Sequence, residues 1–214
     1  MNINLVEKLS QNKVLPIIRS SDPQDVICKA QALLDGGLDI MEINIESPKI
    51  FEAIETLSKD AIVCAGGIIT SLQAKTAIEC GAKIISSPIF QSNLIKISKD
   101  TQIPFIAGTS TANEAYKAWK SRIPLAKIYP ITAMGGVEYI ENLLRPMPFL
   151  KLIPQGDVKL EEVKQYIEKG KFDGFNLDGG MARNTYIDPL IENNVDKILI
   201  ISTRHNFELP QRVK

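Results

Sequence analysis

The segment Leu125-Ala126-Lys127-Ile128-Tyr129 is typical of a buried β-strand, because every residue in it except the lysine is hydrophobic. It belongs to a set of eight short hydrophobic runs, most of them rich in Val and Ile. These runs recur at intervals of roughly 20–25 residues, which is the length of one strand, one helix and two loops. The other seven runs are Val14–Ile18, Ile40–Ile45, Ala61–Ala65, Ile84–Ile85, Ile103–Ala107, Phe149–Ile153 and Gly174–Leu177.

Segments with helical periodicity lie between these runs, and several begin with residues that favour helix N-termini. The expected starts are Asp22-Pro23, Ser47-Pro48, Ser71 and Thr111, and the expected ends include Gly36-Gly37 and Gly81. Hydrophobic strands that alternate with amphipathic helices predict a parallel sheet covered by helices.

Eight such units in 214 residues predict an α/β fold, a (β/α)8 TIM barrel that forms a single domain over residues 1–214. An open doubly wound sheet is the alternative, but it usually carries a glycine-rich phosphate loop after the first strand. Here Arg19-Ser20-Ser21 follows that strand. An extra N-terminal helix is expected over Asn4–Gln11, and a last helix after Asp188-Pro189.

The composition excludes several functional classes. The 25 Lys and Arg residues balance the 25 Asp and Glu residues, so neither nucleic acid nor a membrane surface is expected as a partner. The single histidine, His205, argues against metal sites and Ser-His-Asp triads, and no metal or cofactor is expected. The three cysteines lack a C-x-x-C spacing, which favours reduced, buried thiols in a cytoplasmic protein. No signal peptide is expected, because the N-terminus lacks a basic segment followed by an apolar one, and no apolar run reaches the length of a membrane helix.

Lys127 is the first candidate catalytic residue, because barrel enzymes place their catalytic groups near the C-terminal ends of the strands. Burial disfavours the charged form of a lysine, and a neutral amine can form a Schiff base with a carbonyl group. The alternative is a structural lysine that is ion-paired or reaches solvent. Lys83 and Lys151 lie at the N-terminal ends of their strands and are expected at the opposite, structural end of the barrel.

Two further charged residues are expected at the catalytic end. Glu42 lies within an apolar run and, if it shares the inward face with Asn44, would meet Lys127 across the barrel. A buried carboxyl group can shuttle protons near neutral pH, although a structural ion pair is an equally good interpretation. Arg19 ends the first strand and would suit a carboxylate or phosphate, or a surface ion pair.

Glycines follow several of the predicted strands, at Gly66-Gly67, Gly135-Gly136, Gly156 and Gly179-Gly180. Barrels often bind phosphate through bare backbone N–H groups after the seventh and eighth strands. Any one of these glycines is more often only a turn residue. Together with Lys127 and Glu42, they favour an anionic substrate.

The chain resembles the 2-keto-3-deoxy-6-phosphogluconate (KDPG) and 4-hydroxy-2-oxoglutarate aldolases from Val14 to about Gly180. The order and spacing of several motifs are specific as a set. These motifs are Leu15–Arg19, Gly36–Glu42, Ala61–Gly66, Gly81–Lys83 with Ser87-Pro88, Ile103–Thr111, Ala126–Pro130, Gly135–Val137 and Pro154–Val158.

This resemblance implies a class I aldolase on a small (β/α)8 barrel, assembled as a homotrimer. Its substrate would be a small keto acid, a 4-hydroxy-2-keto acid that is cleaved to pyruvate and an aldehyde. Lys127 would form the Schiff base and Glu42 would act as general acid and base. The substrate-binding residues would be Arg19, Gly67, Pro88, Tyr129, Gly156, Gly179 and Gly180.

The chain departs from the family pattern in its substrate-binding residues. Glu46 stands where the family has an arginine for the pyruvate carboxylate, and Gly67 stands where it has a threonine. Asp157 follows Gly156 and would repel a phosphate, unless Arg19 or Arg183 compensates. Met181 replaces an expected serine. Two alternatives follow: the same chemistry on an unphosphorylated keto acid, or a catalytically silent barrel that binds a metabolite.

Overall fold

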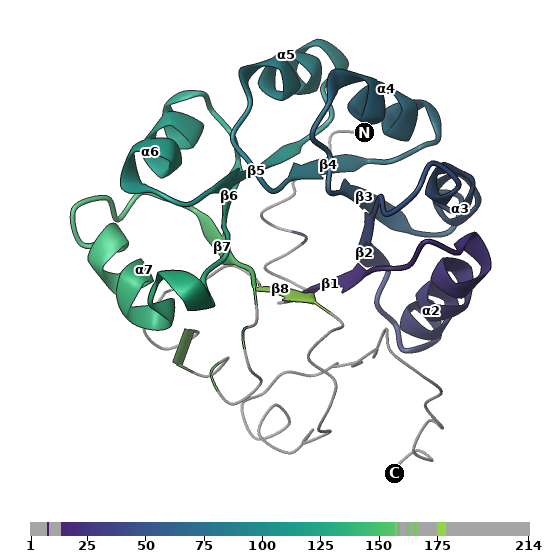
Figure 1. The fold of residues 1–214 in the computed structure, drawn as a ribbon, viewed down its shortest axis with the longest axis horizontal. Coiled ribbons are helices and arrows are strands. Elements are labelled where there is room, and N and C mark those ends of the chain that lie inside the picture. Colours follow the sequence, from purple (N-terminus) through teal and green to yellow (C-terminus); the bar gives the residue numbers. More distant parts are fainter. Residues whose placement is uncertain are drawn as a thin grey trace.

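A computed structural model describes residues 8, 14–156, 158, 162, 165, 166 and 175–178. Within this part, parallel strands alternate with helices, and Figure 1 shows the strands around a common axis with the helices outside them. The strands are β1 (Val14–Ile18), β2 (Ile40–Asn44), β3 (Ile62–Gly66), β4 (Ile84–Ser87), β5 (Phe105–Thr109), β6 (Leu125–Ile128), β7 (Leu152–Pro154) and β8 (Phe175–Asp178). The helices are α2 (Pro23–Asp35), α3 (Ile50–Leu57), α4 (Ser71–Glu79), α5 (Ser92–Thr101), α6 (Ala112–Lys120) and α7 (Gly136–Leu144), with a short 3-10 helix η1 (Thr132–Met134) before α7.

The eight strands form one parallel sheet in the order β7-β6-β5-β4-β3-β2-β1-β8. β1 therefore lies between β2 and β8, with Ile17 beside Glu42 and Val14 beside Phe175. The two ends of this order, β7 and β8, also approach one another, with Cα atoms within 8 Å. The predicted α/β class, with a parallel sheet covered by helices, is confirmed.

Side chains pack on the two faces of the sheet in two separate apolar clusters. The larger cluster fills the space between the sheet and the helices and includes Met41, Ile43, Ala126 and Ile128. The smaller cluster, called here the inner apolar layer, lies on the face that the helices do not cover. It consists of Leu15, Ile40, Cys64, Ile84, Ile106, Leu125 and Ile153. Successive strand residues therefore alternate between the two clusters.

Local sequence explains where two of these helices begin. The Asp22 side chain accepts a hydrogen bond from the backbone N–H of Gln24 at 3.0 Å, which caps α2. Thr111 and Glu114 form a reciprocal capping box at the start of α6. Both starts confirm the sequence prediction.

One predicted helix start is displaced, whereas α4 begins at Ser71 as expected but has a different N-cap residue. Pro48 lies in a turn closed by hydrogen bonds between residues three apart, so α3 begins only at Ile50. The cap of α4 is Thr70 rather than Ser71, because the Thr70 hydroxyl and the Gln73 side chain form a capping box. Because a threonine and a serine are adjacent there, either residue is a plausible cap from sequence.

Several other predictions concern residues at the surface or beyond the described part. Lys83 and Lys151 are exposed and precede β4 and β7, at the N-terminal side expected for them. The prediction of buried cysteines is right for Cys64, whereas Cys80 is half-buried and Cys28 is exposed on α2. Within the described residues, no helix has the length and apolar character needed to cross a membrane.

The predicted N-terminal helix, Asn4–Gln11, lies outside the described residues except for Lys8, which is helical and ion-paired to Asp39 at 2.6 Å. The predicted last helix after Asp188-Pro189 also lies outside them.

Candidate active site

The alternation of side chains along β6 directs Lys127 away from the helices. Its neighbours Ala126 and Ile128 belong to the cluster beneath the helices, whereas Leu125 belongs to the inner apolar layer. Lys127 shares the face of Leu125 and lies two residues closer to the C-terminal end of the strand. Its side chain is only 2% exposed. A lysine in an apolar strand is therefore enclosed on the inner face.

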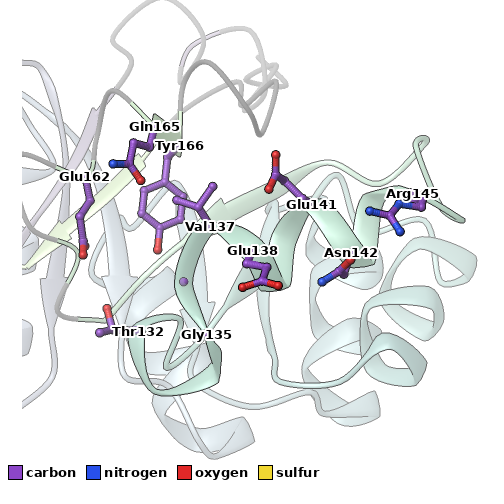
Figure 2. Close-up of a pocket in the computed structure, with 11 residues that line it drawn as sticks. Thr132, Gly135, Val137, Glu138, Glu141, Asn142, Arg145, Glu162, Gln165 and Tyr166 are labelled. Carbon is purple, nitrogen blue, oxygen red and sulfur yellow. The ribbon is translucent and has the colours of Figure 1, made fainter.

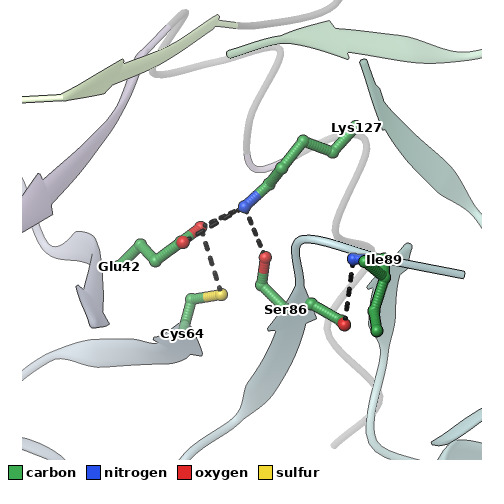
Figure 3. A network of polar contacts seen from close by, with 6 residues as sticks. Glu42, Cys64, Ser86, Ile89 and Lys127 are labelled. Carbon is green, nitrogen blue, oxygen red and sulfur yellow. Dashed lines mark hydrogen bonds and ion pairs between the residues drawn. The ribbon is translucent and has the colours of Figure 1, made fainter. Parts of the chain in front are cut away.

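Glu42 is placed by the same rule on β2. Met41 and Ile43 pack beneath the helices, and Ile40 belongs to the inner apolar layer, so Glu42 faces inward. The Lys127 amine donates to both carboxylate oxygens of Glu42, at 3.1 Å to Oε1 and 3.0 Å to Oε2 (Figure 3). The predicted meeting of these two side chains across the sheet is confirmed.

Ser86 is a third residue at the lysine amine. It lies on β4, two residues beyond Ile84 of the inner apolar layer, and is fully buried. Lys127 Nζ donates to Ser86 Oγ at 2.6 Å, the shortest of its three hydrogen bonds (Figure 3). The sequence analysis missed this residue because it ended the fourth strand at Ile85. Continuing the alternation from Ile84 would have found it.

Cys64 lies on the other side of Glu42, on β3. Its Sγ atom is 4.0 Å from Glu42 Oε2, and its side chain is fully buried in the inner apolar layer. Burial raises the pKa of the Cys64 thiol well above its usual value, and the negative charge of Glu42 raises it further, while Lys127 opposes them. Cys64 is therefore a neutral thiol beside the carboxylate at physiological pH.

Two glycines at the end of β3 leave room for this constellation. A Cβ atom on Gly66 would lie 2.6 Å from Cγ of Glu42, too close for any real contact. Gly67 has φ = +71°, and a Cβ atom there would lie 3.0 Å from the side-chain oxygen of Asn44. The backbone conformation and the neighbouring side chains thus both require glycine at position 67.

A second polar cluster lies at the C-terminal ends of β1 and β2, and it consists of Arg19, Asn44 and Glu46. Glu46 Oε1 accepts hydrogen bonds from Arg19 Nη1 at 3.1 Å and from Asn44 Nδ2 at 2.6 Å. Arg19 follows the C-terminal end of β1, as predicted, but a carboxylate of the chain itself already contacts its guanidinium group. Both side chains are about one-third exposed, so this pair is open to solvent.

Three other predicted binding residues follow β4, β6 and β7. Pro88 follows β4 and packs so closely on Gly108 of β5 that no side chain fits at Gly108. Tyr129 follows β6, precedes Pro130 in a cis peptide bond, and accepts a hydrogen bond from Ser110 Oγ at 2.7 Å through its carbonyl.

Gly156 follows β7 and has φ = +108°, and a Cβ atom there would lie 3.2 Å from Cα of Pro130. Its carbonyl accepts a hydrogen bond from Thr132 Oγ1 at 2.7 Å. The turns after β6 and β7 are therefore held together. Gly179 and Gly180, the remaining predicted binding residues, lie outside the described part of the chain, as does Asp157.

A pocket of about 590 Å³ lies along α7 (Figure 2), and Lys127 is not among the residues that line it. It includes Gly135 and Gly136, two of the glycines that follow predicted strands, but none of the residues predicted to be catalytic or to bind substrate. It is lined by Thr132, Gly135, Gly136, Val137, Glu138, Glu141, Asn142, Arg145, Glu162, Gln165 and Tyr166. The chemically equipped site is therefore the Lys127–Glu42–Ser86 constellation rather than this pocket. Among the described residues, no three His, Cys, Asp or Glu side chains gather in a way that could hold a metal ion.

Known proteins resemble this chain in both sequence and fold. The 2-dehydro-3-deoxy-phosphogluconate aldolase of Haemophilus influenzae is 28% identical over 166 residues, which cover 76% of this chain and 78% of that protein. The KHG/KDPG aldolase of Escherichia coli K12 is 26% identical over 162 residues, covering 74% and 76% respectively.

Among solved structures, the KDPG aldolase of Legionella pneumophila has a similar fold, with a TM-score of 0.78 at 21% identity. The match covers 90% of this chain and 93% of that one, in which pyruvate was captured at low pH as a covalent carbinolamine intermediate. The family described as "KDPG and KHG aldolase" matches residues 5–197, nearly the whole sequence. The chain therefore belongs to the KDPG and KHG aldolase family.

Proposed function

We propose that this protein is a class I aldolase that reversibly cleaves a 4-hydroxy-2-keto acid to pyruvate and an aldehyde. Lys127 is the proposed Schiff-base residue and Glu42 the proposed general acid and base. The observation that carries the proposal is the buried pair of Lys127 and Glu42, joined at 3.0–3.1 Å near the C-terminal ends of β6 and β2.

Energetics argue against a purely structural role for this pair. Enclosing two charges costs several kcal/mol per ion, and apolar side chains of the same size are often at least as stable. Apolar side chains fill the same inner face immediately below, at Ile40 and Leu125. A lysine and a glutamate at the next inward positions are therefore better explained by chemistry than by stability.

The proposed reaction begins with proton transfer from Lys127 to Glu42, which gives the amine a lone pair. The amine attacks C2 of the keto acid, and one proton passes from the attacking nitrogen to the former carbonyl oxygen, which gives a neutral carbinolamine. Glu42 then returns its proton to this hydroxyl group, which leaves as water. The product is a protonated imine that links Lys127 to the substrate.

The protonated imine is the electron sink for cleavage. Glu42 accepts the proton of the C4 hydroxyl group, the C3–C4 bond breaks, and its electron pair moves toward the imine nitrogen to give an enamine and a free aldehyde. Protonation of the enamine at C3 followed by hydrolysis releases pyruvate and restores Lys127. No oxidant or reductant is needed, because the cleavage is redox-neutral.

The residues that follow the C-terminal ends of the strands would bind the rest of the substrate. Arg19 would attract a carboxylate or phosphate, and Tyr129 and Pro88 would line the path to the lysine. Gly67 and Gly156 would allow the substrate to approach the backbone after β3 and β7. These assignments rest on the positions of the residues at the C-terminal ends of their strands.

Borohydride trapping tests the proposed chemistry. The protein is incubated with pyruvate, reduced with sodium borohydride and digested, and the modified lysine is located by mass spectrometry. The expected result is a pyruvate-derived adduct on Lys127 that the Lys127→Ala variant lacks. Lys83→Ala is the matched control. Lys83 is exposed and precedes the N-terminal end of β4, so its loss should leave the adduct unchanged. An unmodified Lys127 in the wild-type protein would contradict the proposal.

A specific observation favours a second candidate, an unphosphorylated substrate. Glu46 neutralises Arg19 and engages Asn44, so an incoming phosphate would have to displace a carboxylate that is already bound. The kcat/KM for phosphorylated and unphosphorylated 4-hydroxy-2-keto acids should be compared in wild type and Glu46→Gln. If Glu46 selects against phosphate, Glu46→Gln improves the phosphorylated substrate more than the unphosphorylated one. Equal changes would contradict this selection.

The architecture and assembly complete the proposal. We propose that the sheet closes into a (β/α)8 barrel, which the approach of β7 to β8 supports. A homotrimer is proposed from the family resemblance, and exposed aromatic side chains offer contact surface. Trp119 lies between Tyr116 and Phe149, with ring centroids 5.7 and 4.4 Å away. Light scattering of the purified protein would measure the mass, and a monomer would contradict the trimer.

A further inference from the structure

We propose that Ser86 is a further catalytic residue, whose hydroxyl oxygen accepts the single N–H bond of the protonated imine and keeps that imine protonated during cleavage. This inference rests on the proposed function, because it assigns a role within the same Schiff-base reaction. The observation behind it is the 2.6 Å hydrogen bond from Lys127 Nζ to Ser86 Oγ inside the inner face of the sheet.

The surroundings of Ser86 make its hydroxyl group unusual. Ser86 is fully buried, and the preceding inward residue of β4 is Ile84 of the inner apolar layer. A buried hydroxyl group without a partner is costly, and the Lys127 amine donates a hydrogen bond to this one. Ser86 therefore has a defined orientation toward the nitrogen at which the reaction takes place.

The number of N–H bonds on Lys127 Nζ falls from three in the ammonium group to one in the protonated imine. The three N–H groups of the ammonium form donate to Glu42 Oε1, Glu42 Oε2 and Ser86 Oγ. A protonated imine keeps only one N–H bond, because the nitrogen forms a double bond to substrate carbon and a single bond to the lysine chain. One acceptor is therefore enough in the imine.

Glu42 is not available as that acceptor throughout the reaction. In the proposed cleavage step it takes the proton of the C4 hydroxyl group, and in the dehydration step it donates a proton to the leaving oxygen. Ser86 is an aliphatic alcohol that stays neutral and remains beside the nitrogen. A division of roles follows: Glu42 moves protons, and Ser86 holds the one that makes the imine an electron sink.

The other groups close to this nitrogen do not compete for that role. Among the described residues, the titratable groups close to this nitrogen are Glu42 on β2 and Cys64 on β3. The Cys64 thiol contacts the carboxylate of Glu42 and is a weak acceptor. Arg19 and Glu46 pair with each other at the C-terminal ends of β1 and β2. Ser86 is thus the neutral oxygen that the described structure places on Lys127 Nζ.

Exchange of the methyl protons of pyruvate in D2O isolates this step. Pyruvate forms the imine with Lys127, loses a C3 proton to give the enamine, and then takes up deuterium at C3 from the solvent. The rate at which the methyl proton NMR signal disappears therefore measures how well the imine withdraws electrons. The rate is measured as a function of pH for wild type, Ser86→Ala, Ser86→Cys and Ser87→Ala. Ser87 is the matched control, because it is equally buried on the same strand but accepts a hydrogen bond from the backbone of Ile89.

Ser86→Ala should slow exchange about tenfold or more, since a hydrogen bond to a charged group is lost. Without Ser86 the imine loses its proton more easily, so the alkaline limb of the pH profile should move down by about one to two pH units. Ser86→Cys keeps the volume but offers only a weak acceptor, and it should shift in the same direction. Ser87→Ala should match wild type in both rate and profile.

The controls separate this inference from the proposed function. If wild type neither exchanges nor is trapped on Lys127, the proposed function fails, and the role of Ser86 fails with it. If wild type exchanges and the Ser86 variants keep its rate and profile, only the role of Ser86 is overturned. Circular dichroism and thermal unfolding establish that each variant is folded. If Ser86→Ala does not fold, Ser86→Cys decides the question.

Discussion

The inner face of the sheet has two neighbouring layers made by the same strands, and they differ completely in chemistry. The inner apolar layer contains Ile40, Ile84 and Leu125. Two residues further along β2, β4 and β6, the same face carries an inner polar layer of Glu42, Ser86 and Lys127. All three polar side chains are buried as fully as those of the apolar layer.

Position along a strand therefore separates packing from chemistry in this protein. The apolar layer stabilises the fold through burial, at about 25 cal/mol per Å² of apolar surface. The polar layer has to meet the cost of its desolvated charges through close hydrogen bonds, which join β2, β4 and β6 at one amine. Gly66 contributes by leaving the space that Glu42 occupies.

The largest effect is expected when the two charged residues of the inner polar layer are replaced by apolar ones. The double variant Lys127→Met with Glu42→Leu should lose turnover entirely, because it removes both the nucleophile and the general base. Its free energy of unfolding should be unchanged or higher by about 1–4 kcal/mol, as for other buried ion pairs replaced by apolar residues. Denaturant titration and a turnover assay measure the two effects.

The matched control is Lys127→Met alone, which leaves the Glu42 carboxylate buried without its lysine and should cost about 3–5 kcal/mol. A double variant less stable than this single variant would mean that the pair mainly stabilises the fold.

A milder change to the same layer should separate its two charged members. Glu42→Gln keeps the shape of the side chain but removes the general base, so turnover should fall by about 10²–10⁴-fold. Trapping of pyruvate on Lys127 should remain detectable, since the nucleophile is intact. Steady-state kinetics and the borohydride assay measure these outcomes, and wild-type turnover in Glu42→Gln would remove Glu42 from the mechanism.

A change in the apolar layer should have the opposite signature. Ile106→Ala removes a fully buried side chain of the inner apolar layer and should destabilise the protein by about 2–5 kcal/mol. At a temperature where the variant is folded, kcat should stay close to that of wild type. Ile106→Val is the graded control, with an expected cost of about 0.5–1.5 kcal/mol. A large loss of kcat with little loss of stability would show that the layers are not separate.

The smallest expected effect concerns the reactivity of the cysteines. The thiolate is the reactive form of cysteine, and the raised pKa of Cys64 leaves very little of it at neutral pH. Iodoacetamide should therefore label the exposed Cys28 first and the half-buried Cys80 more slowly, with Cys64 modified only after unfolding. Mass spectrometry of a labelling time course gives the order. Early labelling of Cys64 in the folded protein would contradict the complete burial of its side chain.

The sequence was sufficient for the parts of the fold and site that depend on local pattern. The eight hydrophobic runs predicted the parallel sheet, and a charged residue in two of those runs identified Lys127 and Glu42. The meeting of these side chains could also be predicted, because strand alternation and the position near the strand ends are local properties.

Other features depend on contacts that a local pattern does not contain. Ser86 was missed because serine in a strand carries no apolar signal, and its burial comes from its neighbours on the sheet. The ion pair of Arg19 and Glu46 joins residues 27 positions apart in sequence. The arginine alone therefore indicated that an anionic group binds there, but not that this group is Glu46. The start of α3 at Ile50 depends on how the turn at Pro48 is hydrogen-bonded.

The place of β1 in the sheet has a consequence for how the chain folds during synthesis. β1 is made first, yet its two neighbours are β2, which follows directly, and β8, whose Phe175 pairs with Val14. One edge of β1 therefore keeps unpaired backbone groups until most of the polypeptide has left the ribosome. Such late, long-range pairing slows folding, and a truncated chain that ends before β8 would expose this edge to association with other chains.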